Sequence, residues 1–187
     1  MEQGFKSRCE SIALGLRREL GLARTDPLSP HALAAYLEIP VLKLSDIPGL
    51  EPADIRQLLI TDPDAWSAIT VAHAGRELII TNPNHPGGRP ATDIMHEIAH
   101  LLLGHEPSTM FYVGDEDIAL RGYNSGAEEE AGWLAGALLL PREALVHIRS
   151  MGLSDTDACN EYGVSQQLLR FRTDMTGVGV QFGGRRR

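Results

Sequence analysis

Apolar residues recur every three or four positions along most of the chain, which predicts a mostly helical protein. The predicted helices combine an apolar face with polar or charged neighbours, and they cover residues 5–22, 31–37, 94–103, 128–140, 142–151, 154–162 and 165–174. Gly21 and Gly104 are suited to end the first and third of these helices. Ser29 is suited to cap the second, and either Thr92 or Asp93 to cap the third.

Three short segments have the composition of strands instead. Residues 41–44 can be extended, and residues 67–72 and 77–81 are β-leaning runs whose four-residue connection predicts an antiparallel hairpin. Residues 82–90 contain three prolines and two glycines and are expected to be a loop. Residues 107–126 are polar and contain glycine, so we expect them to link two helices. The fold class is therefore α+β, mostly helical, with a small sheet before the third helix.

Length and composition narrow the class of protein. The 187 residues suit one ordinary domain, and 43% hydrophobic with 22% charged residues is typical of a soluble folded chain. With 17 basic and 25 acidic residues the formal net charge is −8, so the overall field repels nucleic acid and anionic lipid. A basic DNA-coating protein does not fit this composition.

The cysteines and the apolar runs indicate the compartment. Cys9 and Cys159 are 150 positions apart and form no CxxC pair, which argues against a disulfide framework and against a thiolate zinc site. The first twenty residues mix charged and apolar positions and contain no secretion signal. The longest apolar run, 131–140, has about half the length that crosses a bilayer. We therefore expect a cytoplasmic protein with no membrane contact.

The most informative motif lies in the third predicted helix. His96 and His100 are four residues apart, which places two imidazoles on one face of a helix where both can bind one zinc ion. Glu97 is offset by one position and can act as the base that deprotonates a water molecule. The alternative is that these side chains only hydrogen-bond to one another, but burying them on so apolar a helix would be costly.

A catalytic zinc ion usually has three protein ligands, so a third ligand is needed. The spacing of the metzincin class is excluded, because Glu106 stands where its third histidine would be. We interpret His105 as a polar residue at the end of the helix. The better candidates are three consecutive glutamates at the start of the next helix, where small residues permit close packing: Glu128, Glu129 and Glu130. The helical wheel favours Glu128 without excluding the other two.

These motifs resemble the ImmA/IrrE family of metallo-endopeptidases. They are His-Glu-Ile-Ala-His-Leu-Leu-Leu-Gly-His at 96–105, Glu-Glu-Glu-Ala at 128–131 and Leu-Ala-Gly-Ala-Leu-Leu-Leu-Pro at 134–141. In that family the third ligand is the glutamate 13 residues before the proline, which here is Glu128. The chain departs from the family at Gly132, where Asn or Asp is common, so a hydrogen bond that supports the site is in question.

The resemblance implies a zincin-like fold, a Zn²⁺ cofactor and a protein substrate. It implies that His96, His100 and Glu128 bind the metal, that Glu97 is the catalytic base, and that the substrate is a helix-turn-helix transcriptional repressor whose cleavage derepresses genes of a mobile element or a stress response. For the oxyanion-stabilising group, three residues are candidates: Tyr123, Tyr162 and His105.

The C-terminal part of the chain permits a different function. We expect a metallopeptidase domain over residues 1–150 and, over 151–187, a helix-turn-helix-like extension with a basic tail, packed on the same domain. Cys159, Gly163 and Leu169 have the spacing of a helix-turn-helix, so the alternatives are a DNA-binding or protein-binding regulator in which the zinc ion is structural. The presumed recognition helix is rather apolar, so we expect direct DNA binding to be weak and this segment to serve in packing or in docking the repressor.

Overall fold

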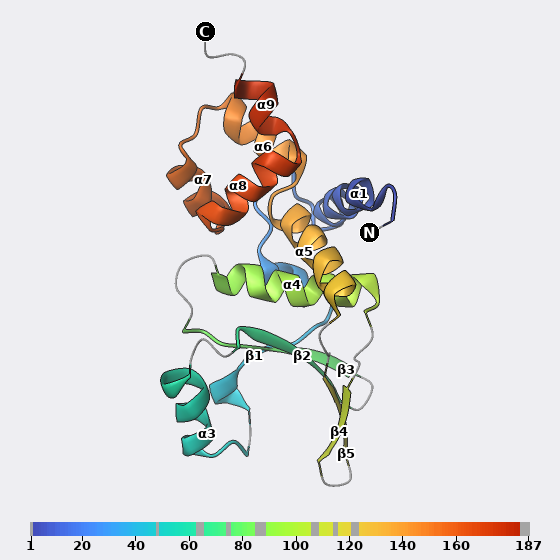
Figure 1. Cartoon of the computed structure of the whole chain (residues 1–187), viewed down its shortest axis with the longest axis vertical. Helices are drawn as coiled ribbons and strands as arrows, with labels where there is room; N and C mark the ends of the chain where they lie inside the picture. The colour runs from blue at the N-terminus through green and yellow to red at the C-terminus, as the bar shows by residue number, and fades with distance from the viewer. Residues whose placement is uncertain are drawn as a thin grey trace.

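The computed structural model describes residues 2–47, 49–62, 66–73, 76–84, 89–105, 109–113, 116–120 and 124–183. A sheet forms one layer, one helix crosses a face of it, and the remaining large helices lie beyond that helix (Figure 1). The prediction of a mostly helical α+β fold with a small sheet is confirmed. Among the described residues, no helix combines the length and apolar character needed to cross a bilayer.

The predicted hairpin lies at the centre of a five-stranded sheet with the order β1-β3-β2-β5-β4. β2 (Ala68–His73) and β3 (Arg76–Thr81) are antiparallel, and β1 (Val41–Lys43) is parallel to β3. The register pairs Thr70 with Ile79, and both side chains are buried. Because α4 contacts both strands, this buried face of the hairpin is the one that supports the helix carrying the two histidines.

The prediction of a linker over residues 107–126 is wrong. This stretch contains a second hairpin, formed by β4 (Thr109–Val113) and β5 (Glu116–Leu120), and β5 pairs with β2. A local signal was present, since a run rich in β-branched and aromatic residues is followed by Gly-Asp, a two-residue hairpin connection. The glycines and polar residues of the whole stretch outweighed that signal.

The seven predicted helices are all present. They are α1 (Phe5–Glu19), α2 (Pro30–Tyr36), α4 (Arg89–Leu103), α5 (Ser125–Leu139), α6 (Arg142–Ser150), α7 (Asp155–Tyr162) and α8 (Gln166–Met175). Three further elements are α3 (Pro52–Arg56), which continues as a π-helical turn over Gln57–Thr61, a 3₁₀ turn over Leu44–Asp46, and α9 (Val178–Gly183). The sequence patterns predicted none of these three.

The helix boundaries confirm some predicted caps and contradict one. The Ser29 hydroxyl accepts a hydrogen bond from the Ala32 amide and caps α2 as predicted. Neither Thr92 nor Asp93 is at the N-cap of α4, because that helix begins at Arg89, five residues before the predicted start at residue 94 and inside the predicted loop. A proline in the first turn is compatible with a helix because the amide it removes would have no partner within the helix.

The apolar helix α5 lies at the centre of the helical layer. Its buried residues share one hydrophobic cluster with α1, α4, α6 and the C-terminal helices. Two buried arginines meet its C-terminal end: Arg17 donates to the Leu138 carbonyl at 2.8 Å and Arg172 to the Leu140 carbonyl at 3.0 Å. Since the last carbonyls of a helix have no partner within it, these arginines fix one end of α5. The opposite end carries the three glutamates.

Candidate metal centre

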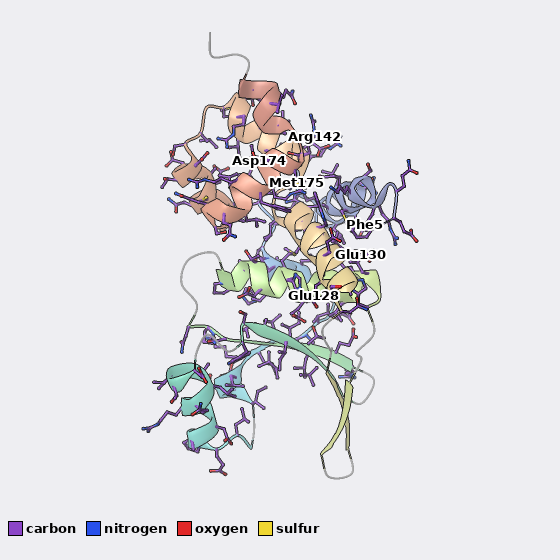
Figure 2. The ribbon with its side chains drawn as sticks, in the orientation of Figure 1. Phe5, Glu128, Glu130, Arg142, Asp174 and Met175 are labelled. Atoms are coloured by element: carbon purple, nitrogen blue, oxygen red, sulfur yellow. The ribbon has the colours of Figure 1, made fainter. Side chains whose placement is uncertain are left out.

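The two histidines of α4 face the beginning of α5. Figure 2 shows Glu128 where the start of α5 crosses α4. The Nε2 atoms of His96 and His100 are 3.1 Å apart. Glu128 approaches them with Oε2 at 3.0 Å from the Nε2 of His96 and Oε1 at 3.4 Å from the Nε2 of His100. Three potential ligand side chains from two helices therefore converge.

These distances fit a zinc ion. Ligands on a tetrahedron at about 2.0–2.1 Å from zinc are about 3.3 Å from one another. The two Nε2 atoms are 3.1 Å apart, and each of them lies 3.0 or 3.4 Å from one of the two Glu128 carboxylate oxygens. Two imidazole nitrogens and one carboxylate oxygen are also a donor set typical of catalytic zinc. Among the described residues, His96, His100 and Glu128 are the group that could hold a metal ion. His100 is 2% exposed, whereas His96 and Glu128 are about one-third exposed, so the cluster is reachable from solvent.

The three glutamates at the start of α5 have different surroundings. Glu128 faces the two Nε2 atoms, Glu129 is exposed, and Glu130 reaches His105. Asn124 caps this end of the helix, since its side-chain oxygen accepts hydrogen bonds from the amides of Gly126 and Ala127. The cap and the two arginines at the other end together fix the position from which Glu128 approaches the histidines.

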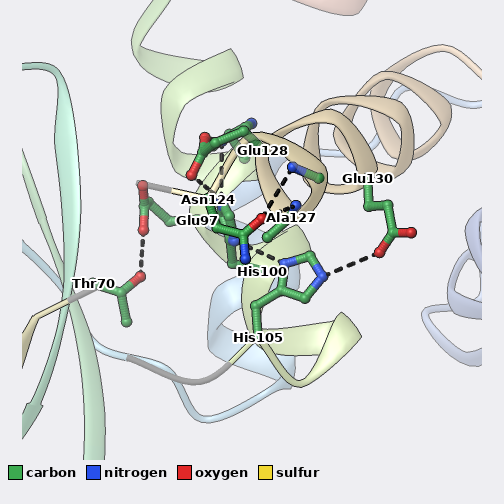
Figure 3. A network of polar contacts seen from close by, with 10 residues as sticks. Thr70, Glu97, His100, His105, Asn124, Ala127, Glu128 and Glu130 are labelled. Carbon is green, nitrogen blue, oxygen red and sulfur yellow. Dashed lines mark hydrogen bonds and ion pairs between the residues drawn. The ribbon is translucent and has the colours of Figure 1, made fainter. Parts of the chain in front are cut away.

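The carboxylate of Glu97 is held from the sheet. The Thr70 hydroxyl, on β2, donates a hydrogen bond to Glu97 Oε2 at 2.5 Å (Figure 3). Glu97 follows His96 directly and precedes His100 by three residues, so it lies beside the ligand cluster on the side that faces the sheet. A carboxylate in this place can hold and deprotonate a water molecule that attacks a substrate bound at the cluster.

His105 lies on the other side of His100. The Nδ1 atoms of the two rings are 2.9 Å apart, and His105 Nε2 is 3.4 Å from Glu130 Oε2. Figure 3 shows His105 between His100 and Glu130. The His105 ring therefore contacts the Nδ1 edge of the His100 ring, which points away from the ligand cluster.

Comparison with known proteins decides the family. The sequence pattern described as the IrrE N-terminal-like domain, which belongs to a family of metallopeptidases, matches residues 51–174. The chain belongs to this IrrE-like peptidase family. The matched residues include both histidines, Glu97 and Glu128, so the resemblance inferred from the motifs is confirmed. Among curated proteins, no sequence matches this chain.

In this IrrE-like chain the described oxyanion candidates have different surroundings. Tyr123 lies outside the described residues. Tyr162 is buried on α7, where its hydroxyl donates to the Thr25 carbonyl at 2.6 Å, and burial raises the pKa of this phenol. His105 contacts His100 through Nδ1, as described above. Of the two described candidates, only His105 is in contact with the ligand cluster.

The departure from the family at Gly132 leaves an open space in the IrrE-like fold. A Cβ atom added at Gly132 would meet no atom within 4 Å. Gly132 is one helical turn after Glu128, and both line a shallow groove with Trp133, Phe171 and other residues. A larger polar side chain could therefore be accommodated here.

Sequence reasoning missed Thr70 and the roles of Asn124 and Glu130. Asn124 had a recognisable signal, because Asn is a favoured N-cap. The predicted helix nevertheless starts at residue 128, three residues after the observed start at Ser125. Thr70 had no such signal, because its contact with Glu97 depends on how β2 lies against α4. For Glu130 the sequence indicates a candidate ligand or a solvated residue of the first turn, and it does not indicate the contact with His105.

Proposed function

We propose that this protein is a zinc-dependent endopeptidase that cleaves a helix-turn-helix transcriptional repressor and so derepresses genes of a mobile element or a stress response. Membership of a metallopeptidase family establishes the broad class. The observation that carries the proposal is the convergence of His96, His100 and Glu128 beside a carboxylate, Glu97, that is not part of the cluster. The repressor as substrate rests on the resemblance alone.

The residues at the centre have separable roles. His96, His100 and Glu128 would hold the ion, and a zinc ion bound there supplies the Lewis acidity that polarises a peptide carbonyl and acidifies water. Glu97 accepts the proton of the attacking water on its carboxylate and then delivers that proton to the leaving amine nitrogen. Thr70 keeps the Glu97 carboxylate oriented during both transfers, because its hydroxyl donates to Oε2.

A structural role for the zinc ion is less consistent with these surroundings. Structural zinc sites are closed by four protein ligands, whereas catalytic sites keep one position for water or substrate. Three candidate ligands converge here among the described residues, and His96 and Glu128 remain 28% and 33% exposed. A partly open site next to a carboxylate supports catalysis.

The proposal is tested by metal content and by cleavage. We expect wild-type protein to bind about one zinc ion per chain and, with zinc, to cleave the helix-turn-helix repressor encoded beside its own gene, with the products identified by mass spectrometry. Glu97→Gln should retain the metal and lose cleavage, whereas His96→Ala should lose both. His147→Ala, a histidine of α6, is the matched control and should change neither. Folded wild-type protein that binds no zinc would refute the proposal.

A further inference from the structure

His105 reaches His100 because of the way α4 ends. Gly104 has a φ of +68°, its amide donates to the Leu101 carbonyl at 3.1 Å, and the His105 amide donates to the His100 carbonyl at 3.0 Å. This pattern is a Schellman motif, which reverses the chain and places the second residue after the helix against the residue three positions before its last. An apolar pair usually occupies those two positions, but here they are histidines.

The two nitrogens of His100 face different partners. Nε2 points toward His96 and Glu128, at 3.1 and 3.4 Å, while Nδ1 is 2.9 Å from the Nδ1 of His105. The two rings are inclined by 68°, with their centroids 5.0 Å apart. His100 is buried and the side chain of His105 is 14% exposed, so this nitrogen pair is largely sheltered from water.

When a metal ion is bound, the hydrogen bonds that link His100, His105 and Glu130 can run in only one direction. A neutral imidazole that offers Nε2 to a metal carries its hydrogen on Nδ1. His100 therefore donates to His105, whose Nδ1 must accept. The hydrogen of His105 is then on Nε2, facing the Glu130 carboxylate at 3.4 Å.

We propose that His105 and Glu130 are positioning residues of the metal centre, which hold the His100 ring with Nε2 facing the ion and its hydrogen on Nδ1. This inference rests on the proposed zinc site and extends it. Partners of this kind orient a ligand and raise its basicity, and their loss weakens metal affinity although every ligand remains. His105 thus acts through His100 and not on the substrate.

The test measures zinc affinity in the full chain by competition with a chromophoric chelator. His105→Phe fills the same volume without an acceptor and should bind zinc about 10–100-fold more weakly. His105→Asn offers an amide oxygen near the position of Nδ1 and should recover most of that loss. Glu130→Gln should weaken binding, whereas Glu129→Gln, the exposed neighbour, should not.

A second readout follows the His100 hydrogen directly. In ¹⁵N-labelled, zinc-loaded protein, long-range histidine spectra should show His100 protonated at Nδ1 and protected from exchange with water. That protection should be lost in His105→Phe and kept in His105→Asn.

The outcomes separate this inference from the function proposed above. Wild-type protein that binds no zinc refutes the metal centre, and the inference falls with it. Zinc binding that is equally tight in wild type and His105→Phe refutes the inference alone, as does an Asn variant as weak as the Phe variant. If His105→Phe does not fold, the comparison of Glu130→Gln with Glu129→Gln decides, and equal affinities overturn the proposal.

Discussion

Thr70 and Glu97 join the sheet to the helix that carries the two candidate histidine ligands. They lie 27 positions apart in the sequence, on β2 and α4, and are linked by a hydrogen bond of 2.5 Å from the threonine hydroxyl to the carboxylate. Thr70 is 6% exposed, so little water competes for this contact. A general base must be held in one orientation to be effective, and for Glu97 in its proposed role the strand provides that restraint.

Thr70→Val should therefore impair cleavage without impairing metal binding. The substitution keeps the shape of the side chain and removes the hydroxyl that donates to Glu97, so we expect kcat on the proposed repressor substrate to fall about 10- to 100-fold. Zinc affinity should stay within about twofold, because no ligand is altered. Steady-state kinetics and chelator competition measure the two quantities.

The matched control for that variant is Thr81→Val. Thr81 is also buried in the sheet, but its hydroxyl donates to the Leu42 carbonyl, at 3.3 Å. We expect Thr81→Val to keep full activity. Equal kcat values for Thr70→Val and wild type would show that the hydroxyl does not position the base.

The two candidate histidine ligands could be predicted from the sequence because their arrangement depends on helix geometry. A spacing of four residues brings His96 and His100 together on any α-helix. The choice of Glu128 over its neighbours required the angle at which α5 crosses α4, which the helical wheel does not contain. The family resemblance supplied that choice, and the structure brings Glu128 to both histidines.

A chain reversal at the end of α4 and a contact between distant elements account for two features that the sequence did not predict. On a continuing helix His105 would point well away from His100, but the left-handed Gly104 reverses the chain and returns the ring to it. The contact between Thr70 and Glu97 depends on how the sheet lies against α4. The second hairpin is different, since its turn signal was local and was outweighed by composition.

Gly132 and Gly136 provide a matched pair for stability on α5. An added Cβ meets nothing within 4 Å at Gly132, whereas at Gly136 it would lie 2.9 Å from Cδ of Arg172. Gly132→Ala should raise the free energy of unfolding by about 0.5–1 kcal/mol through helix propensity. Gly136→Ala should lower it by about 1–3 kcal/mol, because Arg172 is buried and held by hydrogen bonds and cannot easily move.

Urea unfolding followed by circular dichroism measures both variants. The two substitutions add the same methyl group to the same helix, so their difference isolates the space available at each position. Shifts of the same sign in both variants would contradict the prediction.

Arg172 should contribute strongly to stability. Besides the Leu140 carbonyl, its guanidinium contacts the carboxylate of Glu10 on α1, and the arginine is 1% exposed. Arg172→Met should lower the free energy of unfolding by about 3–5 kcal/mol, because it removes a donor to the end of α5 and one partner of a shielded carboxylate. Arg170→Met, at an exposed position of the same helix, should change it by less than about 0.5 kcal/mol.

Cys9 should make the folded protein less stable in alkali. Burial, the largest cause, raises the pKa of this thiol from 9.0 to about 11. Between these values the unfolded chain has released the proton and the folded chain retains it, so stability that is fully present below pH 9 is lost as the pH rises toward 11. A tenfold difference in proton affinity between the two states corresponds to about 1.4 kcal/mol, so the total loss is at most about 3 kcal/mol.

The comparison of wild type with Cys9→Ala isolates this effect. Burial also lowers the pKa of Arg17 to about 10, so this group begins to titrate in the upper part of this range, with the opposite consequence for stability. Because Arg17 is present in both proteins, its contribution cancels in the difference between them. Urea unfolding at about pH 8 and about pH 10.5 should show wild type losing about 1–2 kcal/mol more than Cys9→Ala over this interval. Parallel pH dependences in the two proteins would mean that the folded state does not retain the Cys9 proton.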